Sequence, residues 1–159
     1  MSASRFPHPL LPMLAGGLAA LPLLAPVATA QGAVAAGALI HAAFSAVCHQ
    51  LAERSFVLWG QPVAVCHRCL GLYAGGFVGL MLLPWLPRLR GWLFERPRRL
   101  VWFSIPLLLD VALPFDTWWS RFGSGLLAAF PVAAILWMAW DEIFARQASR
   151  TPAREAAPG

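Results

Sequence analysis

The residues best suited to chemistry lie in one short segment of the chain. All three cysteines and three of the four histidines fall between His41 and Cys69. Cys66 and Cys69 form a C-x-x-C pair, and Cys48 supplies a third thiol. Thiols grouped in this way either ligate a metal ion or exchange electrons through a disulfide. Because the count is odd, a disulfide would leave one sulfur free, whereas a metal could use all three.

The metal hypothesis combines the three thiolates with one imidazole. Such a Cys3His set forms a tetrahedral site for which zinc is the usual ion, although another transition metal would also fit. His49 and His41 are the candidate fourth ligands. His41 precedes Cys48 by seven residues, or two helical turns, so both would share one face if this segment is helical. The predicted ligands are therefore Cys48, Cys66, Cys69 and either His49 or His41.

The redox hypothesis uses the Cys66–Cys69 pair at the start of a predicted helix. Unpaired backbone N–H groups there favour a thiolate. A C-x-x-C at the outer end of the second of four helices resembles the bacterial inner-membrane oxidases that make disulfides and reduce quinone. Those enzymes have a second cysteine pair in the other outer loop, whereas residues 116–121 contain none. In a purely structural interpretation, the cysteines form a buried staple or a static metal clip that holds the outer loop onto the bundle. A third function hypothesis is a structural or assembly subunit of a membrane complex.

Five polar residues are predicted to support the cysteines. Asp110 is an ionisable side chain within an apolar run, so it needs a partner. The three cations available on the same side of the membrane are Arg54, Arg68 and Arg121. An ion pair that orients the loop is one role for Asp110, and proton handling or ligand binding is the other. Tyr73 follows Cys69 by one helical turn, and its hydroxyl reaches the cluster or anchors the helix at the interface.

The composition excludes a soluble domain and indicates the elements that position this cluster. Hydrophobic residues make up 59% of the 159 residues, charged residues only 12%, and the mean hydropathy is +0.64. We therefore predict an all-α, polytopic protein of the lipid bilayer, a single membrane domain over residues 1–144. Its four transmembrane helices are expected at about 10–30, 66–87, 100–115 and 122–140, with a short interfacial or re-entrant helix between residues 32 and 47.

The arginines predict the orientation. All twelve basic residues are Arg, and nine of them fall on one side of the predicted spans. Short arginine-rich loops stay in the cytoplasm, so both termini are expected there and the cysteines on the outer face of the inner membrane. The basic charge therefore marks topology, and no nucleic-acid partner is expected. Residues 145–159 are predicted to be a disordered cytoplasmic tail. As an alternative, Ala28-Thr29-Ala30 resembles a signal-peptide cleavage site, which would leave three spans.

Three glycines mark one face of the second predicted span. Gly71, Gly75 and Gly79 form a doubled G-x-x-x-G pattern. Small residues at this spacing let another helix approach closely in a membrane. We expect the partner helix to come from the same chain, with a homodimer as the alternative.

Two blocks of the sequence resemble an uncharacterised family. The two blocks are CHQLAERSF at 48–56 and CHRCLGLYAGG at 66–76. Three later residues, Asp110, Arg121 and Gly125, resemble a third block of the same family. They are similar to small prokaryotic membrane proteins catalogued as domain of unknown function 2085. Trp118, Trp119 and Ser120 replace the polar Asn residues of that family before Arg121. The resemblance implies that the cysteines and their polar neighbours belong to one motif, and it implies no established activity.

Overall fold

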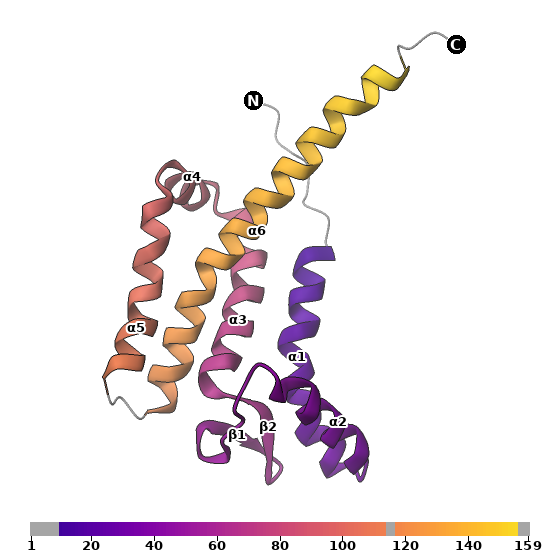
Figure 1. Ribbon diagram of the computed structural model, residues 1–159, viewed down its shortest axis with the longest axis vertical. Helices are drawn as coiled ribbons and strands as arrows, with labels where there is room; N and C mark the ends of the chain where they lie inside the picture. Colours follow the sequence, from indigo (N-terminus) through magenta and orange to yellow (C-terminus); the bar gives the residue numbers. More distant parts are fainter. Residues whose placement is uncertain (1–9, 114–116, 156–159) are drawn as a thin grey trace.

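The computed structural model describes residues 10–113 and 117–155, and helices account for most of them (Figure 1). In chain order the elements are α1 (Leu10–Ala30), α2 (Val34–Ser45), η1 (Ala52–Arg54), β1 (Ser55–Leu58), β2 (Gln61–Cys66), α3 (His67–Leu82), η2 (Leu83–Trp85), α4 (Pro87–Glu95), η3 (Pro97–Ser104), α5 (Ile105–Ala112) and α6 (Trp118–Glu155). The strands and α2 lie at one end of the helix bundle, and α4 lies at the other (Figure 1).

Three helices are long and apolar enough to cross a membrane. Among the described residues they are Leu10–Ala30, His67–Trp85 and Trp118–Ile143. Their outer surfaces remain apolar, as on α1, where Leu14 is 68% exposed. Side chains of this kind are stable on the outside of a helix when lipid covers them. Three of the four predicted spans therefore correspond to candidate membrane helices.

The predicted span at 100–115 does not form a fourth long helix. Pro97–Ser104 is a 3-10 helix, and Ile105–Ala112 continues it as a short α-helix. Each piece has a proline in its first turn, where the missing N–H breaks no helical hydrogen bond. Four spans are therefore not confirmed. The last part of this prediction, residues 114–116, lies outside the described residues.

A two-stranded sheet corrects the all-α prediction. β1 and β2 pair antiparallel, with Leu58 opposite Gln61 and Ser55 opposite Cys66. The connecting residues, Trp59 and Gly60, both have positive φ angles, of 50° and 75°. This is the backbone of a type I′ turn, whose twist matches that of a β-hairpin. The β-branched and aromatic residues of these segments favour strands, which the all-α prediction did not include.

Helix α2 lies within the segment predicted to form a short helix at residues 32–47. It packs on α1 at Gly37, where an added Cβ would lie 2.2 Å from the Thr29 hydroxyl oxygen. Glycine is thus required for the close approach of the two helices. The position of α2 relative to the bilayer stays a prediction.

The glycine face of α3 lies directly against α6. A Cβ built on Gly71 would lie 2.2 Å from the carbonyl oxygen of Phe122, and one built on Gly75 would lie 2.2 Å from that of Leu126. A Cβ on Gly79 would lie 2.7 Å from the Cβ of Ala133. The two helices therefore touch backbone to backbone, and the glycine stripe serves packing within the chain.

We expect Gly75→Ala to destabilise the protein by roughly 1–3 kcal/mol, because the new methyl group meets backbone that cannot move aside without separating α3 from α6. Gly76→Ala is the matched control, since a Cβ at that position meets nothing within 4 Å. It should be neutral or slightly stabilising. Unfolding in detergent micelles measures both, and equal losses for the two variants would contradict the packing argument.

Helix α6 also includes part of the segment that was predicted to be a disordered tail. Helix α6 continues to Glu155, so residues 145–155 are helical, while 156–159 lie outside the described residues. A helix that is already formed extends without a new nucleation cost. Ala145, Arg146, Gln147 and Ala148 all favour that extension.

Candidate metal centre

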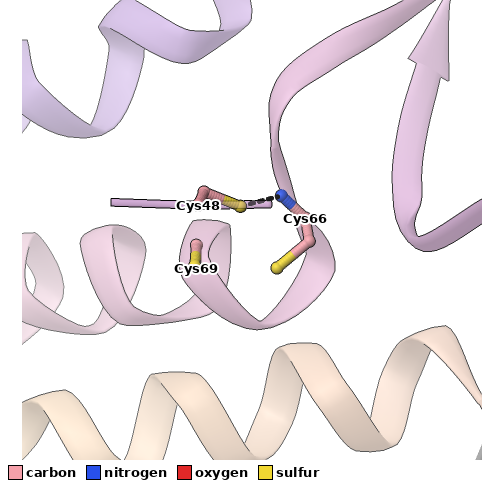
Figure 2. Close-up of side chains that lie close together, drawn as sticks. All are labelled: Cys48, Cys66 and Cys69. Atoms are coloured by element: carbon pink, nitrogen blue, oxygen red, sulfur yellow. Dashed lines mark hydrogen bonds between the residues drawn. The ribbon is translucent and has the colours of Figure 1, made fainter. Parts of the chain in front are cut away.

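Three thiols from separate elements meet at the end of the bundle that carries the hairpin. Cys48 follows α2, Cys66 ends β2, and Cys69 lies in the first turn of α3. Their sulfur atoms all lie within 4.8 Å of one another, and none is in a disulfide. The backbone N–H of Cys66 donates to the sulfur of Cys48 at 3.2 Å, as Figure 2 shows. Two distant parts of the sequence thus supply one compact group of sulfur ligands.

The side chain of Gln50 fixes the segment that carries Cys48. Its amide nitrogen donates to the carbonyl oxygen of His41 at 2.7 Å and to that of Ala64 at 2.9 Å. These bonds join the loop to α2 on one side and to β2 on the other. Gln50 has a φ of 52°, so the chain turns sharply just after Cys48. The thiol cluster is therefore held by a defined turn, although a loop carries one of its members.

Buried strand residues support the other two thiols. Val63, Ala64 and Val65 of β2 are almost completely buried against α1 and α2. They lead directly into Cys66, which stands at the N-cap position of α3. The strand thus delivers Cys66 to the helix start, and the first turn of α3 brings Cys69 beside it.

The electrostatics of the cluster favour a thiolate at Cys66. A hydrogen bond with the Cys69 thiol lowers the pKa of Cys66 from 9.0 to about 5, although burial opposes this shift. Hydrogen bonds with the backbone of Cys69, with Cys48 and with the backbone of Arg68 add to the effect. The thiolate is the form of cysteine that ligates metals and attacks disulfides. Cys66 is therefore prepared for either chemistry at neutral pH.

The predicted histidine ligands lie near the cluster without joining it. Within the described part of the chain, no histidine nitrogen lies within 4.8 Å of all three sulfurs. His49 is exposed, and His41 is half-buried on α2. A fourth ligand from either one would require its imidazole to turn toward the thiols, so this role stays a prediction.

Of the three candidate cations, Arg68 forms an ion pair with Asp110. The side chain of Asp110 is 3% exposed. The Nε of Arg68 donates to the Oδ2 of Asp110 at 3.0 Å, and the hydroxyl of Ser120 donates to Oδ1. The carboxylate thus ties α3, which carries Cys69, to α5 and α6. A buried charge that is paired and hydrogen-bonded in this way is tolerated at low dielectric.

The remaining predicted support residues are dispersed around the cluster. Tyr73 packs edge-on against the ring of Phe44, with 5.8 Å between the ring centroids. Arg54 is exposed on η1, and Arg121 lies in the first turn of α6. Tyr73 also packs against the buried core around Cys48.

Comparison with known sequences places this arrangement in a family. A family described as predicted membrane proteins of domain of unknown function 2085 matches residues 48–135. The chain belongs to this family. The matched range runs from Cys48 to α6 and contains the three thiols and the Arg68–Asp110 pair, whereas α1, α2 and His41 precede it. The thiol cluster therefore belongs to the family's part of this membrane protein.

A relative from an archaeon extends the comparison. The uncharacterized protein MJ1492 of Methanocaldococcus jannaschii is 33% identical over 102 residues. The match covers 58% of this chain and 63% of that relative, so the chain spans less than two thirds of its length. No solved structure matches the chain significantly.

Two supporting residues of this family member were not predicted from the sequence. Gln50 belongs to the Cys-His-Gln block, but its double hydrogen bond depends on where β2 lies. The hydroxyl of Ser120 bonds Asp110. A polar residue one position before Arg121, in an otherwise aromatic stretch, was the available signal.

Proposed function

We propose that this protein binds a transition metal ion, zinc by preference, through Cys48, Cys66 and Cys69. The observation that carries the proposal is the convergence of three free sulfurs within 4.8 Å. A tetrahedral zinc ion with bonds of about 2.3 Å requires sulfurs roughly 3.8 Å apart, so small side-chain movements are sufficient. His49, His41 or a water molecule would complete the coordination. Three soft thiolates also suit other thiophilic ions.

Metal analysis of the purified protein tests this proposal. Purification in mild detergent without chelator, followed by elemental analysis, should find about one equivalent of zinc per chain. The ion should leave when a chelator is added under acidic conditions, because protonated thiols do not ligate. Less than about a tenth of an equivalent, with all thiols reduced and with none gained after incubation with zinc, would contradict it.

We further propose that the cluster faces the outside of the inner membrane and that the chain crosses four times. The segment from η3 through α5 runs beside α6 (Figure 1). At standard rises its sixteen residues extend roughly 28 Å, close to the thickness of the hydrocarbon core. Leu108, Leu109 and Val111 are exposed on it and suit lipid. Helix α4, whose sequence includes Arg88 and Arg90, lies at the opposite end of the bundle from the hairpin that leads into Cys66 (Figure 1).

Reporter fusions test this topology, because an even number of membrane crossings places both termini on the same side. With four crossings, green fluorescent protein fused to either end should fluoresce in a bacterial host, since it folds in the cytoplasm. Alkaline phosphatase at the same ends should be inactive. With three crossings, one terminus would lie outside. At that terminus alkaline phosphatase would be active and green fluorescent protein would be dark, and this result would refute the proposed topology.

Thiol redox chemistry is the second candidate, favoured by the low pKa of Cys66 within its C-x-x-C pair. Oxidation of Cys66 and Cys69 to a disulfide would release two electrons and two protons to an acceptor such as a quinone. Trapping of thiols in living cells should then find a fraction of this pair oxidised. Permanently reduced cysteines under oxidising growth would exclude this candidate and leave the metal proposal intact.

A further inference from the structure

A strongly basic segment lies at the end of the bundle opposite the hairpin (Figure 1). Residues 86–100, which include α4 and the first half of η3, contain five arginines and one glutamate. We call these residues the basic segment. It contributes nothing to the thiol cluster, so its charge requires an explanation independent of metal binding.

Two candidate membrane helices end at the basic segment. The first, His67–Trp85, ends two residues before α4 begins. The second, Trp118–Ile143, carries Asp141 close to its end, and the Nη1 of Arg90 lies 3.4 Å from the Oδ2 of Asp141. Figure 1 shows α4 foreshortened, whereas the long helices are seen from the side, so α4 lies across the end of the bundle. We therefore place the basic segment at the depth of the lipid headgroups.

Two arginines of the segment are held by the protein itself. Arg90 pairs with Asp141. Arg99 lies 4.0 Å from the Oε2 of Glu95. Its guanidinium also lies over the ring of Trp92, 4.3 Å from the centroid, and donates to the carbonyl oxygen of that residue. Because both arginines are half-buried and bonded within the chain, their charges serve the fold.

The other three arginines, Arg88, Arg96 and Arg98, are exposed. They form no ion pair with any residue that the structure describes. Leu93 of α4 is fully buried in the bundle, so the helix between them is anchored. Like charges on an anchored backbone repel one another unless anions lie beside them. The arrangement therefore favours an anionic partner outside the chain.

Exposed tryptophans favour lipid as that partner. Trp85, Trp92 and Trp102 lie in or next to the basic segment and are 71%, 46% and 71% exposed. Tryptophan rings concentrate where the hydrocarbon meets the headgroups. A second copy of this chain would bring like charges together, and a soluble anion would give the indole rings no apolar contact. An anionic lipid satisfies both the arginines and the tryptophans.

We propose that the basic segment binds the headgroups of phosphatidylglycerol, an anionic phospholipid, through Arg88, Arg96 and Arg98. A guanidinium group binds two phosphate oxygens at once. The phosphate of phosphatidylglycerol keeps its full negative charge, whereas the ammonium group of phosphatidylethanolamine compensates it. Each arginine near a membrane surface adds roughly a fivefold preference for anionic lipid. The thiol cluster takes no part, so failure of the metal proposal would leave this one untouched.

Lipid retention by the full-length protein tests the proposal. The protein is extracted in mild detergent from vesicles with equal amounts of phosphatidylglycerol and phosphatidylethanolamine, and native mass spectrometry counts the lipids that stay bound. Phosphatidylglycerol should be retained at least about fivefold more than phosphatidylethanolamine. Extraction at about 1 M salt, where the screening length is about 3 Å, should reduce this ratio toward one. Equal retention of the two lipids at low salt, or a protein dimer without bound lipid, would overturn the proposal.

Substitutions identify the arginines that bind. Arg88→Gln, Arg96→Gln and Arg98→Gln combined should bring the retention ratio close to one, at exposed positions where folding is not at risk. Lysine at the same three positions keeps the charge and should keep most of the preference. Arg54→Gln, at an exposed arginine beside the hairpin, is the matched control for the single variant Arg96→Gln and should leave the ratio unchanged. An unchanged ratio in the triple glutamine variant, or equal losses for Arg54→Gln and Arg96→Gln, would contradict the proposal.

Discussion

Replacing Cys48 with serine should remove the metal from the purified protein. Serine is not deprotonated at neutral pH and is a poor ligand for a soft ion. Cys48 is the one sulfur that comes from outside the Cys66–Cys69 pair, and it is 6% exposed. The two remaining sulfurs would hold an ion from one side only. We expect the zinc content to fall from about one equivalent to less than about a tenth, measured by elemental analysis after gel filtration.

The other cysteines and the nearby histidines complete this experiment. Cys66→Ser and Cys69→Ser should lose the metal as completely as Cys48→Ser. Ser45→Ala is the control, because Ser45 is exposed at the end of α2 and bonds only within its own helix. His49→Ala and His41→Ala then identify the fourth ligand, since only the coordinating imidazole should matter. Retention of zinc by Cys48→Ser would show that the cluster is not the binding site.

Replacing Arg68 with methionine should be among the most destabilising single changes in the chain. The variant removes the guanidinium that pairs with the Asp110 carboxylate, whose side chain is 3% exposed, and keeps the neutral Ser120 hydroxyl as a partner. Removal of one partner from a buried ion pair typically costs 3–5 kcal/mol. We expect a loss of about that size in the free energy of unfolding, measured by denaturation in mixed micelles. Arg54→Met, at an exposed arginine, should change stability by less than about 0.5 kcal/mol.

The double variant Arg68→Met with Asp110→Asn tests the cause. Asparagine removes the negative charge and still accepts the Ser120 hydrogen bond, so most of the lost stability should return. Additive losses in the double variant would mean that Arg68 stabilises the bundle through packing of its side chain. In that case the ion pair would not be what joins α3 to α5.

The thiol cluster could be predicted because the cysteines lie close together in the sequence. Cysteines are rare in this chain, and the spacing of Cys66 and Cys69 places both at the start of one helix. The three long apolar helices follow from composition in the same way. The glycine spacing predicted a close helix contact, and the structure identifies α6 as the partner.

The parts that could not be predicted depend on distant contacts or on backbone angles. Trp59-Gly60 forms the hairpin turn through two positive φ angles, and tryptophan gives no signal of such a conformation. Asp110 required a cation, but the choice of Arg68 over Arg54 or Arg121 depends on how α3 and α5 pack. The shift from 3-10 to α geometry before Ile105 depends similarly on the neighbouring helices, because the apolar run alone suits either form.

The double hydrogen bond of Gln50 has a consequence for how the site would bind an ion. Contacts within the protein itself hold the turn after Cys48, the hairpin and the first turn of α3. The conformational entropy of these segments is therefore lost when the chain folds, before any ion binds. A zinc finger, in contrast, orders its chain only when the ion binds. Here, release of an ion would leave the surrounding backbone ordered. Binding of an ion at such a site would not have to order the surrounding loops, which favours affinity.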